Sequence, residues 1–168
     1  LWASEELVFK HSFPSYSTKL LELGCGVGRI SFSLWMMGYQ NLTATDVSKK
    51  MIKRANAIQR ERKSAIQFNQ EDATNLTFSA GLFDGIIFGF NGLMQIPHRE
   101  NRKKVMHECY RVLRPGGRFI FTSHDRKIPK WKKFWENEKK KWRIGMQDKA
   151  LVEFGDRYGE TTNGKLFI

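Results

Sequence analysis

The chain from residue 19 onward alternates short apolar runs with longer segments in which apolar residues recur every three or four positions. The short runs are rich in residues that favour strands and span about residues 19–23, 42–46, 66–70, 83–88 and 118–123. Segments of helical period separate most of them. Strands that alternate with helices in this way predict an α/β fold, in which a mostly parallel sheet lies between layers of helices.

Three of the helical segments carry boundary signals. A helix over about residues 28–37 is expected to end at Gly38, because glycine adopts the left-handed conformation of a helix cap at little cost. Ser48 is a natural N-cap for a second helix, since its hydroxyl can accept a backbone N–H of the first turn. A third helix over about residues 99–113 is expected to end at the sequence RPGG, where Pro115 cannot continue it.

The pattern changes in residues 126–145, which form a basic aromatic insertion after the fifth expected strand. Trp131, Phe134, Trp135 and Trp142 recur at spacings of three, four and seven, which places them on one face of a helix. Aromatic residues spaced in this way most often pack a helix onto its domain. They could also line a substrate pocket, or bind RNA together with the neighbouring lysines. Because the aromatic face leaves the lysines elsewhere, we favour packing together with a pocket lid.

The C-terminal tail, residues 150–168, includes the sequence FGDRYGETTNGKLFI. This sequence predicts two short strands joined by the turn TTNG. The patterns together describe a single domain over residues 1–168, with a core at residues 19–125 that the insertion and the hairpin-like tail follow. Since the sequence stops on an apolar run, we expect the native chain to continue beyond Ile168.

Composition narrows the expected setting and partners. Of the 168 residues 40% are hydrophobic, and no run approaches the roughly 20 apolar residues that cross a bilayer, so we expect no membrane partner. Cys25 and Cys109 cannot form a four-ligand zinc site between them, so we expect no metal and a reducing, cytoplasmic setting. The net charge is +12, and residues 126–143 hold nine basic and two acidic side chains. Such a segment can attract phosphates, although many solvated helices carry a similar face.

Gly24, Gly26 and Gly28 directly follow the first expected strand. A loop without Cβ atoms can turn tightly and expose backbone N–H groups to a ligand at the start of a helix. Asp46 ends the next strand, where a carboxylate can accept both hydroxyl groups of a ribose. The dinucleotide pattern G-x-G-x-x-G fits poorly, since Arg29 stands where the last glycine would be when counted from Gly24. The Tyr-x-x-x-Lys pair of short-chain dehydrogenases is also absent.

Five stretches in order over residues 19–125 resemble class I S-adenosylmethionine-dependent methyltransferases: LLELGCGVG, ATDVS, QEDATNLTF, FDGIIFGFNGLMQIP and YRVLRPGGRFIF. The resemblance implies a Rossmann-like, doubly wound, three-layer fold and S-adenosyl-L-methionine as the cofactor. Glu22 would lie near the ammonium of its aminoacyl tail, Asp46 would bind the ribose, Met51 would cover the adenine, and Asp72 and Ala73 would bind the adenine edge. The full cofactor set that it implies is Glu22, Gly24, Cys25, Gly26, Gly28, Asp46, Val47, Met51, Asp72, Ala73, Phe90 and Asn91.

Several of these residues also have an ordinary structural explanation. Glu22 could be a buried strand residue satisfied by a helix N-terminus, although its place just before the glycines favours the ligand role. Asp46 could be a turn residue, and Asp72 could cap a following turn. Phe90 could equally belong to the core, and Asn91 could cap its loop. The occurrence of these residues together and in this order along the chain, rather than any single residue, supports the cofactor site.

The acceptor and any catalytic base are less defined. His98 and His124 lie at element ends on the edge where such sheets bind ligands, and an imidazole there could take a proton from an acceptor. Histidines at such places are most often surface residues. The sequence predicts methyl transfer to a small-molecule acceptor. The alternatives are an RNA methyltransferase that uses the basic insertion, and an NAD-binding oxidoreductase or nucleotide-binding module; the oligomeric state stays open.

Overall fold

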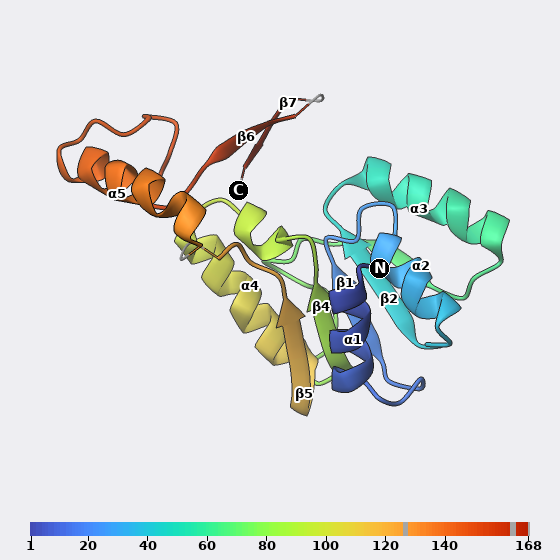
Figure 1. Ribbon diagram of the computed structural model, residues 1–168. Coiled ribbons are helices and arrows are strands. Elements are labelled where there is room, and N and C mark those ends of the chain that lie inside the picture. The colour runs from blue at the N-terminus through green and yellow to red at the C-terminus, as the bar shows by residue number, and fades with distance from the viewer. Residues whose placement is uncertain (126–127, 162–163, 168) are drawn as a thin grey trace.

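The computed structural model of the chain describes residues 1–125, 128–161 and 164–167 (Figure 1). Five strands form one parallel sheet in the order β3-β2-β1-β4-β5, and two further strands form an antiparallel hairpin. The elements are α1 (Ala3–Ser12), β1 (Leu20–Leu23), α2 (Arg29–Met36), β2 (Leu42–Asp46), α3 (Lys49–Arg62), β3 (Gln67–Gln70), β4 (Phe83–Phe88), the 3-10 helix η1 (Gly92–Gln95), α4 (Arg99–Val112), β5 (Leu113–Phe121), α5 (Pro129–Arg143), β6 (Tyr158–Thr161) and β7 (Gly164–Phe167).

The central strands of the sheet are buried on both faces, which confirms the predicted three-layer α/β fold. Successive side chains of a strand point to opposite faces of its sheet. Leu20 therefore joins a core with side chains of α1, α2 and α3, whereas Leu21 and Leu23 join a second core with Val105 and Cys109 of α4. The central strands β1 and β4 are apolar on both sides for this reason, as is usual in parallel sheets.

Two predicted helix boundaries are confirmed. The Ser48 hydroxyl accepts the N–H of Met51 at 3.4 Å and caps α3. Gly38 follows α2 with a φ of 103°, and its N–H donates to the carbonyl oxygen of Trp35 at 2.9 Å. The Ser48 cap fixes where α3 begins after β2, and Gly38 fixes where the chain leaves α2.

The fifth strand differs from the prediction. It begins at Leu113 instead of residue 118, so that the sequence RPGG lies within β5 and not before it. Arg114 precedes Pro115, and the proline ring keeps the residue before it out of the helical region, so α4 ends earlier than residue 113. A register shift in the pairing with β4 accommodates the turn of the backbone at Gly116, where φ is 79°.

Helix α1 and η1 were not among the predicted elements. In α1 only Glu5 and Phe9 are buried, so its apolar period is too weak to read from the sequence. Figure 1 shows α1 against the sheet in front of β1 and β4, and Phe9 joins the core that α2 and α3 cover. The N-terminal segment therefore belongs to the same layer as those helices.

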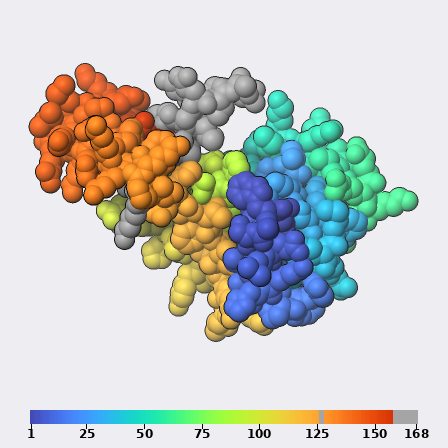
Figure 2. Space-filling view, in the orientation of Figure 1, coloured from blue at the N-terminus to red at the C-terminus, as the bar shows by residue number. Residues whose placement is uncertain are grey.

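The chain after β5 forms a separate lobe. Figure 2 shows α5 and the segment after it, in orange and red, as a lobe that projects from the body. Trp135 and Trp142 of α5 pack on Phe154, with ring centroids 6.1 and 6.3 Å apart, so these rings pack α5 against the segment that follows it within the lobe. The two predicted tail strands are present, while residues 162–163 of the predicted TTNG turn lie outside the described residues. In the described part of the chain, no helix is long and apolar enough to cross a membrane.

Candidate active site

The glycine loop connects the end of β1 to the start of α2. Gly24, Gly26 and Gly28 all have left-handed backbones, with φ values of 62°, 56° and 93°. A Cβ at Gly24 would lie 2.7 Å from the ring of Phe88, and one at Gly28 would lie 2.9 Å from two core rings. A Cβ at Gly26 would meet nothing within 4 Å, so the loop opens there onto free space. Cys25 is buried, and its side chain joins the core cluster on the side of α2 and α3.

Asp46 links the glycine loop to the turn that follows β2. One carboxylate oxygen accepts the N–H of Gly26 and the other accepts the N–H of Ser48, both at 2.8 Å. The turn role that we considered for Asp46 is therefore present. Each carboxylate oxygen can accept more than one hydrogen bond, so the same group can still receive hydroxyl donors from a ligand.

Glu22 is buried under the start of α2. Its side chain accepts the N–H of Ser31 at 2.9 Å and also accepts the Ser31 hydroxyl. Burial raises the pKa of Glu22 to about 7, although the bonds from Ser31 act in the opposite direction. These are the contacts of a strand carboxylate satisfied by a helix N-terminus. The role of Glu22 near a ligand ammonium stays a prediction.

The residues predicted for the adenine lie after β2 and β3. Val47 and Met51 are exposed apolar side chains, 67% and 43% accessible, at the start of α3. Asp72 accepts both the N–H and the hydroxyl of Thr74 at 2.8 Å, so it caps the turn after β3 as its structural alternative foresaw. Ala73 packs partly against the core that α4 covers. An exposed apolar patch and an exposed carboxylate thus lie at neighbouring strand ends.

The loop after β4 has an unusual backbone. Phe90 and Asn91 both have left-handed φ values, 51° and 57°, which cost energy for residues with a Cβ and occur preferentially at functional sites. The Asn91 N–H donates to the hydroxyl of Thr122 at 2.6 Å, which ties the loop to the end of β5. Phe90 is 57% exposed, so the alternative that it belongs to the core is wrong. Its ring lies 6.1 Å from that of Trp2.

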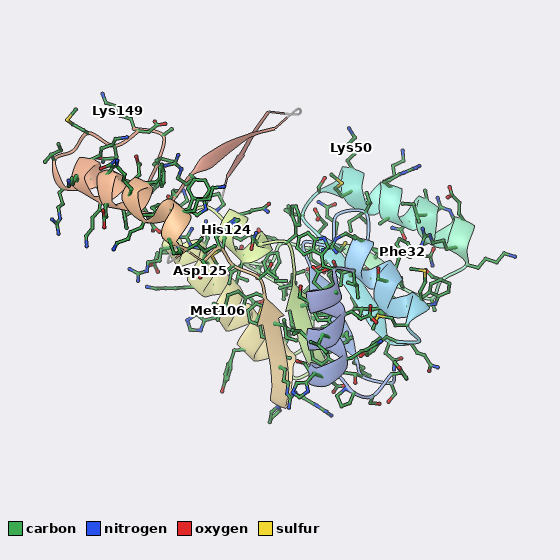
Figure 3. All side chains as sticks on the ribbon, viewed as in Figure 1. Phe32, Lys50, Met106, His124, Asp125 and Lys149 are labelled. Carbon is green, nitrogen blue, oxygen red and sulfur yellow. The ribbon has the colours of Figure 1, made fainter. Side chains whose placement is uncertain are left out.

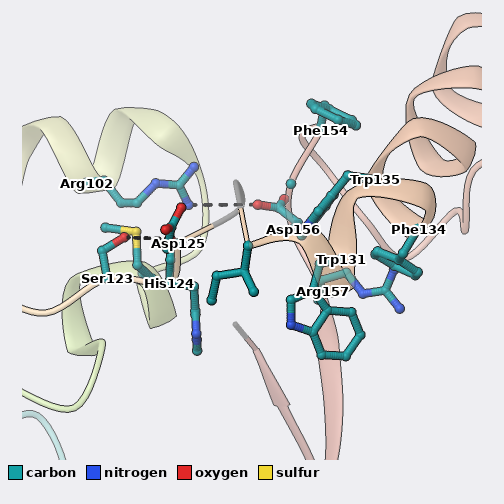
Figure 4. A pocket seen from close by; sticks show the side chains of 13 residues that line it. Arg102, Ser123, His124, Asp125, Trp131, Phe134, Trp135, Phe154, Asp156 and Arg157 are labelled. Atoms are coloured by element: carbon teal, nitrogen blue, oxygen red, sulfur yellow. Dashed lines mark hydrogen bonds and ion pairs between the residues drawn. The ribbon is translucent and has the colours of Figure 1, made fainter.

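A cavity of about 500 Å³ opens one strand further along the same edge, between the end of β5 and the α5 lobe. Figure 3 places His124 and Asp125 at this strand end. Figure 4 shows the aromatic side chains of α5 on the opposite wall. The lining residues are Met94, Arg102, Ser123, His124, Asp125, Ile128, Trp131, Phe134, Trp135, Phe154, Gly155, Asp156 and Arg157.

Ion pairs tie the walls of this cavity together. Arg102 of α4 pairs with Glu153 and lies 3.9 Å from Asp156 (Figure 4). The guanidinium of Arg157 lies 4.2 Å from the ring centroid of Phe134 in α5. The segment at residues 153–157 therefore bridges α4 and α5, and residues 154–157 line the cavity.

The sequence matches the model of the methyltransferase domain family over residues 20–117. This stretch is more than half of the chain, and it contains the glycine loop, Asp46 and the ends of β1 to β4. The chain belongs to the methyltransferase domain family. The family implies S-adenosyl-L-methionine as the cofactor of this methyltransferase domain.

Curated relatives and solved structures agree with this assignment. The chain is 32% identical over 118 residues to the eEF1A lysine and N-terminal methyltransferase of Xenopus laevis, covering 67% of this chain and 17% of the relative. It is 35% identical over 105 residues to the demethylmenaquinone methyltransferase of Desulfitobacterium hafniense, covering 60% and 40%. The chain thus spans less than half the length of both relatives. The crystal structure of the PH0226 protein from Pyrococcus horikoshii OT3 superposes with a TM-score of 0.70 at 26% identity, covering 97% of this chain and 70% of that one.

The two candidate histidines of this methyltransferase domain are not brought together. His124 lines the cavity, whereas His98 is not among its lining residues and instead precedes α4 with a left-handed φ of 66°. The cavity also contains residues that the sequence did not indicate, above all Arg102, Asp156 and Arg157. Arg102 lies more than 50 residues before the other two and shares no motif with them, so only the fold brings them together. The regular spacing of aromatic residues in α5 was the one feature of the sequence that indicated a pocket here.

Proposed function

We propose that this domain transfers a methyl group from S-adenosyl-L-methionine to a small molecule held in the cavity at the end of β5. The observation that carries the proposal is that the glycine loop, the strained loop after β4 and the cavity open at successive strand ends of one sheet edge. Ligands of open parallel sheets bind at this edge. Cofactor and acceptor would therefore lie side by side.

The residues on the cofactor side fit the chemical groups of S-adenosyl-L-methionine. The open space at Gly26 supports the close approach of its aminoacyl tail. The fixed carboxylate of Asp46 would accept the ribose hydroxyls, and the exposed side chains of Val47 and Met51 would cover the adenine. The remaining carboxylate oxygen of Asp72 and the backbone of Ala73 would meet the edge of the adenine.

When bound, the cofactor supplies an electrophilic methyl group on a sulfonium sulfur. The contribution of the chain is to hold the acceptor atom in line with that group and to keep water out. Positioning of this kind can account for roughly 7 to 11 kcal/mol of a barrier. His124 lines the cavity and would take up the proton of a hydroxyl or amine acceptor.

The walls of the cavity favour a planar acceptor. Trp131, Phe134, Trp135 and Phe154 supply aromatic surface, and flat rings stack on such side chains. A volume of about 500 Å³ lies within the range of small-molecule pockets. Trp131, Phe134 and Trp135 of α5 line this cavity, and Trp135 and Trp142 pack on Phe154, so these rings favour a pocket for a small molecule over a surface for RNA bases.

The test is transfer of label from methyl-tritiated S-adenosyl-L-methionine to sets of planar phenols, quinols and aromatic amines. We expect one set to accept the label. We further expect Trp135→Leu to raise the KM of the acceptor and to leave that of the cofactor unchanged. Tyr110→Leu, which replaces an 84% exposed aromatic residue on α4, is the matched control and should behave as wild type. Transfer to protein or RNA alone would contradict the proposal.

A further inference from the structure

A buried ion pair joins the N-terminal helix to the glycine loop. The Glu5 side chain is only 4% exposed, and its two oxygens accept from the two terminal guanidinium nitrogens of Arg29 at 2.7 and 2.8 Å. Arg29 begins α2 directly after Gly28. One oxygen of Glu5 also accepts the N–H of Trp2 at 3.0 Å. A bidentate pair with this geometry fixes the start of α1 relative to the loop.

The same pair places an aromatic side chain at the ligand edge. The Arg29 guanidinium lies over the ring of Trp2, 5.1 Å from its centroid, and the Trp2 ring lies 6.1 Å from that of Phe90. Both rings stay more than half exposed, although they are among the largest apolar side chains of the molecule. Phe90 also has a strained left-handed backbone. Neighbouring exposed rings on a strained loop are typical of a surface that a ligand covers.

We propose that Trp2 and Phe90 form an aromatic wall over the part of the cofactor that lies between the glycine loop and β4, and that Glu5 and Arg29 are the positioning residues that hold it. The inference rests on the proposed function. It adds Trp2, the N-cap of a helix that the sequence motifs do not include, to the predicted cofactor residue Phe90. It also assigns a role to Arg29, the residue that interrupts the dinucleotide pattern, because Arg29 would position the aromatic wall.

A second ion pair, formed within α1, is an ordinary surface contact and serves as a comparison. Glu6 and Lys10 lie 2.6 Å apart, but both side chains are about half exposed and both belong to α1. Pairs of this kind contribute little to stability. Glu5, by contrast, is buried and reaches across 24 residues of sequence to Arg29, and this partner lowers the pKa of Glu5 below its ordinary value. Loss of Arg29 would leave the buried carboxylate of Glu5 uncompensated.

The test measures binding of S-adenosylhomocysteine to the whole chain by calorimetry, with the dissociation rate followed by displacement of labelled ligand. We expect Trp2→Leu to raise the dissociation constant about tenfold, the size expected for a lost aromatic contact. Glu5→Gln should raise the dissociation rate in the same direction. Glu6→Gln is the matched control, and it should stay within about twofold of wild type.

Thermal unfolding separates a binding role from a structural one. Glu5→Gln can lower the Tm because it disturbs a buried pair, whereas Trp2→Leu alters an exposed ring and should leave the Tm unchanged. If Trp2→Leu and Glu5→Gln both bind the ligand as wild type does, the inference is overturned, whatever happens to the Tm. A wild-type chain that binds no S-adenosylhomocysteine would instead overturn the proposed function itself.

Discussion

At the scale of single residues, Asp46 combines two tasks in one carboxylate. It orients the backbone of the glycine loop through Gly26 and starts α3 through Ser48, and the proposed function adds the ribose hydroxyls. The sequence indicated the ligand role from the position of Asp46 at a strand end. It could not reveal the bond to Gly26, because that contact depends on how the loop folds back over β2.

We expect Asp46→Asn to weaken the binding of S-adenosylhomocysteine by about tenfold to a hundredfold, since hydrogen bonds to a charged group contribute roughly 1.5 to 3 kcal/mol. The asparagine keeps one acceptor oxygen, so the fold should survive. Calorimetric titration gives the affinity and thermal unfolding checks the fold. Unchanged affinity would show that the ribose assignment is wrong.

Glu22 makes a prediction about pH. Because burial raises its pKa from 4.5 to about 7, the folded chain binds more protons than the unfolded chain in this window, and the free energy of unfolding falls as pH rises through it. Glu22→Gln removes this titration. Between pH 5 and 8 the variant should lose less stability than wild type, by a difference on the order of 2 to 3 kcal/mol. Urea unfolding at the two pH values measures this difference, and equal losses would refute the assignment.

At the scale of elements, the sequence predicted the parallel strands well because their apolar runs reflect burial on both faces. β2 and β4 begin and end at the predicted residues, 42–46 and 83–88. The predicted bounds are wrong where a local sequence signal competes with strand pairing, and an element was missed where its apolar periodicity is weak. β5 extends back to Leu113 because Leu113 pairs with Phe83 of β4 and the pairing resumes at Arg118, on the other side of the RPGG sequence. Helix α1 was not predicted because it buries only Glu5 and Phe9, although Glu5 forms the ion pair with Arg29.

The glycine loop allows a matched test at this scale. Gly26 and Gly116 both have left-handed backbones and open space where a Cβ would stand. Gly26→Ala and Gly116→Ala should therefore lose similar stability, about 1 to 2 kcal/mol each. Only Gly26→Ala should also abolish measurable binding of S-adenosylhomocysteine, because its methyl group would occupy the space that the ligand needs. Equal binding by the two variants would place the ligand elsewhere.

At the scale of the whole molecule, the cavity is the feature that sequence reasoning reached least. Its walls come from α4, the end of β5, α5 and residues 153–157, and no spacing rule connects Arg102 with Asp156. The aromatic period of residues 131–142 predicted a packed helix and a pocket lid. In the structure, two of these rings pack on Phe154, and Trp131, Phe134 and Trp135 line the cavity.

The charge of the chain leads to a prediction about RNA. Nine basic side chains within residues 126–143 should give weak RNA binding whose affinity falls steeply with salt, because counterion release drives it. We expect no transfer of methyl label to RNA at any salt concentration. A mobility assay across a salt series, paired with a filter assay for labelled RNA, checks both statements. Methylated RNA would favour the nucleic-acid alternative over a small-molecule acceptor.

The central claim is that the edge formed by β1, β2 and β4 binds S-adenosyl-L-methionine. Calorimetric titration of the wild-type chain with S-adenosylhomocysteine, and separately with NAD⁺, tests it most directly. The account predicts saturable binding of one S-adenosylhomocysteine per chain, lost in Gly26→Ala, and no heat of binding with NAD⁺. Saturable binding of NAD⁺ with no response to S-adenosylhomocysteine would contradict it.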